Sequence, residues 1–146
     1  MLEQTIQAGA VPVLEAMIRF TGQRQRLLAH NVANLTTPNF QALDASPEGF
    51  QAMLAEAVHA RRRANGGVGG PLPMRSTRQV RVGGDGSLAL RPERVHAGPL
   101  LHDRNNRDVE RLMQAMTENY GMYRVASDLL RSRVGELRTA ISQRVG

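Results

Sequence analysis

The sequence of 146 residues contains no cysteine and no tryptophan, and aromatic residues make up only 3% of it. The absence of cysteine excludes a disulfide framework and a thiolate metal site. With so few large rings, any hydrophobic core must be built mainly from other apolar side chains. No apolar run approaches the roughly 18 residues that a membrane-spanning helix needs.

The sequence also lacks the pattern of a cleaved signal peptide. It opens MLEQTIQAGA, with an acid at position 3 and no basic start before an apolar run. If the protein leaves the cytoplasm, we expect it to use a route that does not depend on a cleaved leader.

Lysine is absent, so all 19 basic residues are arginine, and the formal net charge is +6. Residues 45–107 carry ten arginines and five acids, a net charge of +5. Residues 1–44 are neutral and residues 108–146 carry +1. The basic excess therefore lies in the middle of the chain, where it could meet nucleic acid, an acidic protein or an anionic surface.

The N-terminal part carries a narrow apolar stripe at helical spacing. Pro12 suits the first turn of a helix, because its missing N–H costs nothing there. Pro38 disfavours the helical conformation at Thr37, so the helix is predicted to end near Asn34. The stripe has polar interruptions at Thr21 and Gln25. Its members are Leu14, Met17, Ile18, Thr21, Gln25, Leu28, Val32 and Leu35.

The middle of the chain is rich in turns. A short helix is predicted over residues 47–63, followed by a glycine- and proline-rich stretch at 64–73. The alternation of valines and leucines around Gly83-Gly84-Asp85-Gly86 predicts a small β-hairpin over residues 80–90. An isolated hairpin is marginal in water, so we expect it to lean on a helix or a neighbouring chain. Residues 91–106 are predicted to be loop.

The strongest periodic signal lies between residues 106 and 143, where apolar residues alternate in steps of four and three. This is the period of a coiled-coil seam. Gly121 and Gly135 each cost a helix about 1 kcal/mol relative to alanine, which predicts close packing at those positions. The seam consists of Val109, Met113, Met116, Tyr120, Tyr123, Ser127, Leu130, Val134, Leu137 and Ile141.

These signals predict a mainly α fold. The N-terminal helix (residues 1–35) and the C-terminal helix (residues 105–146) are expected to pair as an elongated, coiled-coil-like hairpin. The irregular middle (residues 36–104) would contain the short β-hairpin. One interpretation is a small helical hairpin with an insert. The other is a subunit that completes its core only against copies or partners, since helices take most of their stability from packing.

The stretch Ala29-His30-Asn31-Val32-Ala33-Asn34-Leu35-Thr36-Thr37-Pro38-Asn39-Phe40 resembles the N-terminal signature of bacterial flagellar axial proteins, the rod, hook and hook-associated family. That signature reads approximately Ala-Ser-Asn-(Ile/Leu)-Ala-Asn-x-x-Thr-Pro-Gly-(Tyr/Phe). The departures are His30, where a small polar residue is usual, and Asn39, where glycine is usual. Asparagine tolerates a left-handed backbone, so the turn is expected to survive. The matching positions are Asn31, Ala33, Asn34, Thr37, Pro38 and Phe40.

The C-terminal region, residues 104–141, is similar to the last helix of the FlgB type of proximal rod protein. Asn105-Asn106-Arg107-Asp108 matches the start of that helix, with Arg107 in place of an apolar residue. Asn119 and Tyr123 match its middle, and residues 137–141 match its tail. Residues 73–81 also resemble a stretch of that family, with Gln79 in place of histidine. The resemblance covers about half the chain.

The resemblance implies a structural, non-enzymatic subunit of the proximal rod in the periplasmic part of the flagellar basal body. Such a subunit transmits torque from the membrane ring to the distal rod and hook. It would be exported without a cleaved signal peptide by the flagellar type III apparatus. Its partners would be other copies of itself, other rod proteins, and the ring and rod-adaptor proteins, with no cofactor, nucleic acid or small-molecule substrate.

The resemblance also assigns roles to particular residues. Asn31 and Asn34 would hold the helix end and the following turn. Asn34 is either a simple C-terminal cap or an inter-subunit contact, and Asn31 has a possible role in helix register. Phe50 and Leu54 match the Phe-x-x-x-apolar element that rod and hook subunits are thought to show to the export gate before folding. The alternative is the ordinary apolar face of a short helix.

Catalysis has little support in the sequence. His30, His59, His96 and His102 are widely spaced and show no metal-ligand pattern. No nucleophile–base pair is recognisable. Two alternatives remain open. One is a small basic helical protein that binds nucleic acid, although the middle of the chain has almost no aromatic residues to stack on bases. The other is a different proximal rod subunit, such as FlgC.

Overall fold

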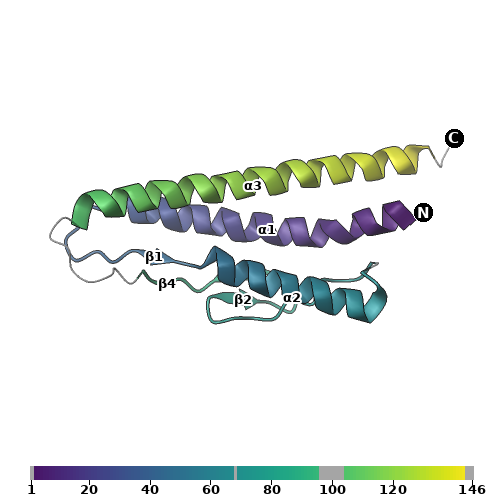
Figure 1. Ribbon diagram of the computed structural model, residues 1–146, viewed down its shortest axis with the longest axis horizontal. Coiled ribbons are helices and arrows are strands. Elements are labelled where there is room, and N and C mark those ends of the chain that lie inside the picture. Colours follow the sequence, from purple (N-terminus) through teal and green to yellow (C-terminus); the bar gives the residue numbers. More distant parts are fainter. Residues whose placement is uncertain (1, 68, 96–103, 144–146) are drawn as a thin grey trace.

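The computed structural model describes residues 2–67, 69–95 and 104–143, with side chains described over 9–67, 69–95 and 109–143. The helices are α1 (Leu2–Ala33), α2 (Pro47–Asn65) and α3 (Arg104–Ser142), and the strands are β1 (Leu43–Asp44), β2 (Val80–Val82), β3 (Leu88–Leu90) and β4 (Glu93–Arg94). The two long helices lie side by side, with the start of α1 and the end of α3 at the same end of the molecule (Figure 1). The predicted fold class is confirmed.

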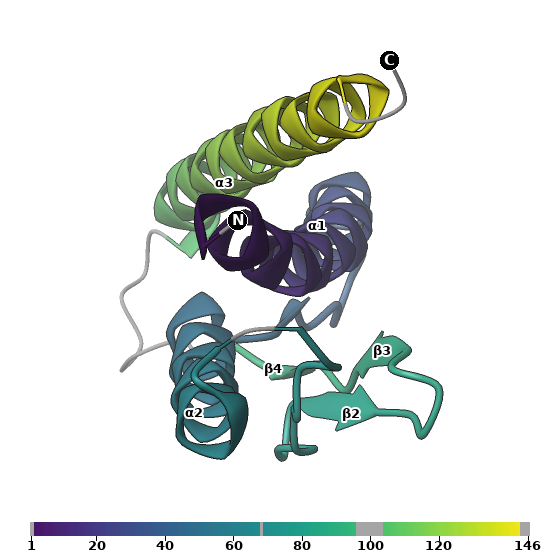
Figure 2. The ribbon, with the colours of Figure 1, turned by 90° about the vertical axis from the view of Figure 1, so that its right-hand side faces the viewer.

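Helix α1 lies between α3 on one side and a layer formed by α2 and the strands on the other (Figure 2). Its Thr21 faces α3, and Leu14 and Leu28, seven residues to either side, share that face. Ala16 and Phe20 join the hydrophobic core that α1 forms with α2 and the strands. The sequence predicted the first face but not the second.

The expected place of Pro12 in the first turn of a helix is wrong, because α1 begins at Leu2, close to the expected start at residue 1, and Pro12 lies inside it. A proline inside a helix loses one backbone hydrogen bond and costs about 3 kcal/mol. Tertiary contacts support the turn before Pro12. Nη1 of the buried Arg61 on α2 donates to the carbonyl oxygen of Gly9 at 2.9 Å, and a side chain at Gly9 would meet the Gly67 carbonyl.

The predicted short helix is confirmed as α2. Ser46 caps its N-terminus by accepting a hydrogen bond from the Gly49 N–H at 3.0 Å, and Pro47 occupies the first turn. Gly66 ends the helix in the left-handed conformation, with φ of 66°. The buried face of α2 presents Phe50 and other apolar side chains to α1 and the strands.

The predicted hairpin is confirmed as the antiparallel pair β2–β3, in which Val80 faces Leu90 and Val82 faces Leu88. It leans on α1, as expected. The Gln23 side chain donates to the Leu88 carbonyl at 2.6 Å and accepts from the Leu90 N–H at 3.1 Å. Part of the predicted 91–106 loop is instead structured.

Glu93 and Arg94 form β4, which pairs antiparallel with Leu43 and Asp44 of β1. Helix α3 begins at Arg104. Residues 96–103, including His96 and His102, lie outside the described residues.

Helices α1 and α3 pair as predicted, but α3 does not present the centre of the predicted seam to α1. The fully buried residues of α3 are Asn119 and Ala126, each one position before a seam residue. Tyr120 is 54% exposed and Met113 is 48% exposed. The expected close packing at Gly121 and Gly135 is wrong within this chain, since nothing lies within 4 Å of a side chain built at either position.

The other seam residues divide by depth. Leu14 and Leu28 are buried, while Tyr123 and Ile141 are exposed. The half-buried members are Ile18, Val32, Val109, Met116, Ser127, Leu130, Val134 and Leu137.

Candidate functional site

The turn after α1 is built by the residues that carry the signature. Asn34 closes the helix: its backbone N–H and its side-chain Nδ2 both donate to the His30 carbonyl, at 3.2 and 2.9 Å. The Thr37 N–H then donates to the Asn34 carbonyl at 2.9 Å, and the Phe40 N–H donates to the Thr37 carbonyl at 3.2 Å. Asn34 therefore satisfies helix-terminal carbonyls within its own chain, as a cap residue does.

Asn39 and His30, the two departures from the signature, both fit this turn. Asn39 has φ of 60°, so asparagine adopts the left-handed conformation where the signature has glycine. The His30 ring packs edge-on against the Phe40 ring, with centroids 5.8 Å apart. His30 thus supports the exit from α1 through an aromatic contact. Pro38 is exposed and sets the direction of the turn.

Asn31 is completely buried and binds both backbone groups of one residue in β1. Its Nδ2 donates to the Leu43 carbonyl at 2.7 Å, and its Oδ1 accepts from the Leu43 N–H at 3.2 Å. The Asn31 amide therefore makes the two hydrogen bonds with Leu43 that the backbone of a neighbouring strand would make. The structure places Asn31 on the face of α1 that meets β1, so its hydrogen bonds set the path of the returning chain.

A second buried contact fixes β1 and was not predicted from the sequence. Arg24, 5% exposed, binds Asp44 through two parallel hydrogen bonds, Nε to Oδ1 at 2.9 Å and Nη2 to Oδ2 at 2.7 Å. Asp44 Oδ1 also accepts from the Ala45 N–H at 2.8 Å. Bidentate arginine–carboxylate pairs are among the stronger polar contacts in proteins. The 20-residue separation leaves no local pattern by which to detect the pair.

The α1–α3 interface contains a buried amide at its centre. Asn119 Nδ2 donates to the Thr21 carbonyl at 2.9 Å and to Gln25 Oε1 at 2.7 Å. The contact with the Gln25 side chain explains the polar interruption at Gln25, whereas at Thr21 the backbone carbonyl is used and the hydroxyl donates to the Met17 carbonyl at 2.7 Å. Among the described residues, Asn119 Oδ1 is the buried side-chain atom that lacks a hydrogen-bond partner.

Gln79 holds the middle of the chain together, at the position where the resembling stretch has histidine. Its Oε1 accepts from the Ser46 N–H at 2.8 Å, and its Nε2 donates to Glu93 Oε2 at 3.2 Å. It therefore joins the start of α2 to β4. Glu93 also pairs with Arg78.

Phe50 and Leu54, the candidate export-gate residues, are both buried in the folded chain, at 4% and 7% exposure. The Phe50 ring stacks on Phe20 with centroids 4.1 Å apart and planes 4° apart. In this fold the pair is the apolar face of a short helix, which was the alternative interpretation. A receptor could reach these side chains only before the chain folds.

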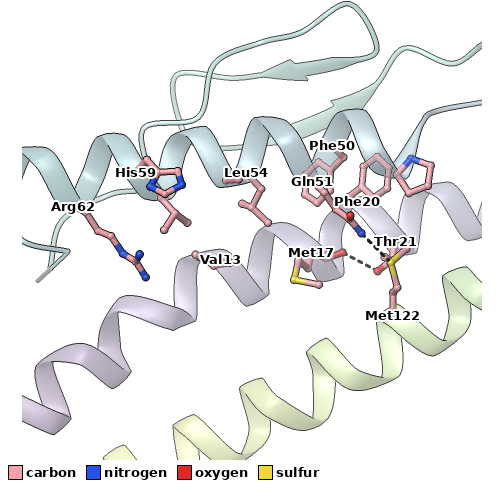
Figure 3. Close-up of a pocket in the computed structure, with 13 residues that line it drawn as sticks. Val13, Met17, Phe20, Thr21, Phe50, Gln51, Leu54, His59, Arg62 and Met122 are labelled. Atoms are coloured by element: carbon pink, nitrogen blue, oxygen red, sulfur yellow. Dashed lines mark hydrogen bonds between the residues drawn. The ribbon is translucent and has the colours of Figure 1, made fainter.

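An apolar groove of about 360 Å³ runs beside this stack, between α1, α2 and the middle of α3 (Figure 3). Val13 and Met17 line it from α1, and Met122 reaches it from α3. Gln51 bridges α2 and α3 by donating to the Met122 sulfur at 3.7 Å. The α2 wall consists of Pro47, Phe50, Gln51, Leu54, Ala55, Val58, His59 and Arg62.

The described residues assemble no recognisable catalytic or metal-binding constellation. They contain no group of three or more potential metal ligands. The pKa of Glu48 is lowered mainly by its own backbone N–H and also by the Ser46 hydroxyl, and the pKa of Asp85 is lowered by Ser87. Both carboxyls are exposed and serve local turns.

No family model, curated protein or solved structure matches this chain. Among the described helices, none is long and apolar enough to cross a membrane. The candidate site is therefore defined by the geometry alone. It consists of the α1 exit around Asn31 and Asn34, the α1–α3 interface around Asn119, and the apolar surfaces that α3 leaves uncovered.

Proposed function

We propose that this protein is a structural subunit of the proximal rod of the bacterial flagellar basal body, of the FlgB type. The observation that carries the proposal is the use of the signature residues. Asn31, Asn34 and Asn39 build the exit from α1, while Asn119 joins α1 to α3. Three residues on which the resemblance depends, Asn31, Asn34 and Asn119, thus help to set the geometry of the helical hairpin, and Asn39 adopts the left-handed conformation where the signature has glycine.

The shape of the molecule fits a subunit of an elongated assembly. The 39 residues of α3 give a helix roughly 58 Å long, and α1 lies against it (Figure 1). Paired helices along one axis resist bending and twisting, as a torque-transmitting shaft requires. Large apolar side chains such as Tyr120 and Ile141 remain exposed on α3, as expected of a helix that meets neighbouring subunits.

A deletion of the gene in its own organism tests the proposal. We expect the deletion strain to be non-motile and to lack hooks and filaments, because a rod without its proximal segment cannot support them. Expression of the wild-type protein should restore both. A motile deletion strain with intact basal bodies would contradict the proposal. A paralogue that replaces the missing protein would also keep the strain motile. Deleting every copy of the paralogous rod gene as well removes that explanation.

The rival functions have different support. A FlgC-type rod subunit shares the N-terminal signature, and the structural features above fit it equally well. A nucleic-acid-binding role is favoured by exposed arginines in the middle of the chain, namely Arg62, Arg63, Arg75, Arg78, Arg81, Arg91 and Arg94. Gel-shift and anisotropy measurements of DNA binding over a salt series test the nucleic-acid-binding role. Salt-dependent DNA affinity at physiological ionic strength would favour it.

A further inference from the structure

We infer that the apolar groove between α1, α2 and α3 binds a single-chain amphiphile with an anionic head group, of the class of a free fatty acid. The hydrocarbon chain of the ligand lies along the groove, and its carboxylate meets Arg62 at one end. Such a site is independent of the proposed function, because the groove is lined by none of the signature residues between Asn31 and Phe40.

The groove is long and narrow. Its wall on α2 extends from Pro47 to Arg62, which is roughly 22 Å at 1.5 Å per residue. Its volume of about 360 Å³ falls in the range of small-molecule sites, about 300–1,000 Å³. Spread over that length, 360 Å³ leaves a width of roughly 4 Å, close to the separation of carbon atoms in van der Waals contact. This width fits one extended hydrocarbon chain and is too small for a helix, whose diameter with side chains is about 10–12 Å.

The middle of the groove is apolar on every side. Met17, Leu54 and Met122 contribute one side chain each from α1, α2 and α3 (Figure 3). Methionine side chains are flexible and fill irregular apolar spaces, so the two methionines can adjust to a chain that lies between them. A hydrocarbon chain in this position leaves water and contacts all three helices.

One end of the groove is basic. Arg62 and His59, three residues apart on α2, line the end that lies towards the start of α1 (Figure 3). Both side chains are exposed, and no carboxylate among the described side chains lies within ion-pair distance of Arg62. We call these two residues the basic end. A guanidinium and an imidazole can both donate hydrogen bonds to a carboxylate.

The opposite end of the groove has carboxylates nearby. Glu48 follows Pro47 on α2, and Glu118 lies one turn before Met122 on α3. Neither lines the groove, and each accepts a hydrogen bond from a neighbour in its own segment. An anionic head at this end would face both carboxylates. The carboxylate of the ligand is therefore expected at the basic end.

The arginines of α3 do not compete for the head group. Arg111 and Arg133 lie eleven residues before and after Met122, on the same side of the helix, and neither lines the groove. Arg133 pairs with Glu136 at 2.9 Å. Of the described residues that line the groove, Arg62 is the one with a permanent charge. Charge complementarity therefore favours an anionic amphiphile over a neutral or a cationic one.

Occupation of the groove would strengthen the contact between α2 and α3. In the folded chain Gln51 bridges these helices by donating to the Met122 sulfur at 3.7 Å. A hydrocarbon chain beside this bridge would contact both helices and α1 at once. A ligand that binds the folded chain and not the unfolded one raises the Tm.

Isothermal titration calorimetry of the full chain with dodecanoate, below its micelle-forming concentration, tests the inference. We expect one ligand to bind per chain and the Tm to rise. Affinity should increase by up to about fourfold for each methylene group added between octanoate and dodecanoate, because each buried methylene leaves water. Dodecanol and dodecyltrimethylammonium, with a neutral and a cationic head, should bind at least about tenfold more weakly than dodecanoate. Failure of dodecanoate to bind, or equal binding of either analogue, would overturn the inference.

Arg62→Gln and Arg63→Gln form a matched pair of variants. Both arginines are exposed at the end of α2, but Arg63 lines a different surface of that helix. Arg62→Gln should weaken dodecanoate binding at least about tenfold and leave dodecanol binding unchanged. Arg63→Gln should change neither affinity. Equal losses in the two variants would show that the general charge of the helix end attracts the ligand, and would overturn the role of Arg62.

A second matched pair tests the position of the hydrocarbon chain. Ala55 lines the groove, whereas Ala52 lies on the other surface of α2, and both are exposed. Ala55→Phe places a ring in the narrow groove and should abolish dodecanoate binding. Ala52→Phe should bind dodecanoate like the wild type. Circular dichroism checks that both variants keep their helix content. Binding that survives Ala55→Phe would place the ligand elsewhere and overturn the inference.

Other occupants of the groove give different results. Self-association of the free protein that both Ala55→Phe and dodecanoate abolish, measured by sedimentation velocity, would assign the groove to a second copy. Cosedimentation with phosphatidylglycerol vesicles, without binding of free dodecanoate, would assign it to a lipid in a bilayer. Either result would overturn the inference. The rod proposal is tested separately by the motility of the deletion strain, so each can fail without the other.

Discussion

The side chain of Asn119 on α3 donates a hydrogen bond to the backbone carbonyl of Thr21 on α1, 98 residues earlier in the chain, at 2.9 Å. The same amide nitrogen also binds Gln25 Oε1. One completely buried residue thereby fixes how the two long helices meet. Because the Asn119 amide nitrogen meets both acceptors in one alignment of the helices and loses them in others, it favours a single register.

Asn119→Ala should lower the free energy of unfolding by about 1–3 kcal/mol, because it removes both hydrogen bonds and leaves Gln25 without its donor. Urea denaturation followed by circular dichroism measures the change. Gln114→Ala is the matched control, since that exposed side chain binds only Glu118 on its own helix. Equal effects of the two substitutions would show that Asn119 does not hold the interface.

Arg24→Gln should destabilise the fold by about 3–5 kcal/mol, the usual cost of breaking a buried pair by removing one partner. The side chains of Arg24 and Asp44 are 6% and 25% exposed, and the loss of Arg24 leaves the carboxylate of Asp44 in β1 without its ion-pair partner. Arg131→Gln is the control, because Arg131 is 79% exposed and its pair with Asp128 is worth less than about 1 kcal/mol. Thermal unfolding of the three proteins, compared at one pH, distinguishes the pairs.

Asn31→Ala should disturb assembly more than export. Asn31 binds Leu43 of β1 in the folded chain, and this contact does not exist in the unfolded chain. Secreted protein is quantified by immunoblot, and incorporation into basal bodies is measured in the same strains. Asn31→Asp is a sharper companion, since a carboxylate cannot donate to the Leu43 carbonyl. Normal motility of the Asn31→Ala strain would refute this role.

Phe50→Ala and Phe20→Ala separate folding from export. Each removes one ring of the same stack, so each should destabilise the fold by about 3–5 kcal/mol. If Phe50 is read by the export gate before folding, only Phe50→Ala should reduce secretion. Secretion that falls equally in both variants, or in neither, would assign Phe50 to the core alone.

Glu48 makes a small contribution to pH dependence at the start of α2. Its pKa is lowered from 4.5 by its own backbone N–H first and by the Ser46 hydroxyl second. A carboxyl with a lowered folded pKa stabilises the fold above its unfolded pKa, and this contribution is lost as the pH falls from 4.5 through the folded value. Glu48→Gln should flatten stability over that acidic range and leave its slope near neutral pH unchanged, as a pH series of urea denaturations measures.

Local patterns in the sequence were enough to predict the elements that depend on local chemistry. The alternation of Val80 with Val82 and of Leu88 with Leu90 around a glycine-rich turn predicted the hairpin, and heptad spacing predicted α3. The turn at Asn39 followed from the tolerance of asparagine for the left-handed conformation. In each case the decisive residues lie within a few positions of one another.

Features that depend on distant residues were missed. The polar interruption at Gln25 was visible, but its partner Asn119 lies almost a hundred positions away. The two-residue strands β1 and β4 carry no periodic signal, and the contacts that hold β1 come from Asn31 and Arg24 on α1.

Two sequence rules misplaced residues for the same reason. The proline rule placed Pro12 in the first turn of a helix, whereas Pro12 lies inside α1 and a contact from Arg61 supports the turn before it. The heptad rule marked the apolar line of α3, but the face that packs on α1 is centred on Asn119 and Ala126. Tertiary packing decided both.

Mass spectrometry of purified hook–basal bodies from the source organism tests the central claim most directly. The account predicts that peptides of this chain copurify with the rod and disappear from the preparations of a strain in which the gene is deleted. The absence of the chain from well-preserved basal bodies that retain their other rod proteins would contradict the account.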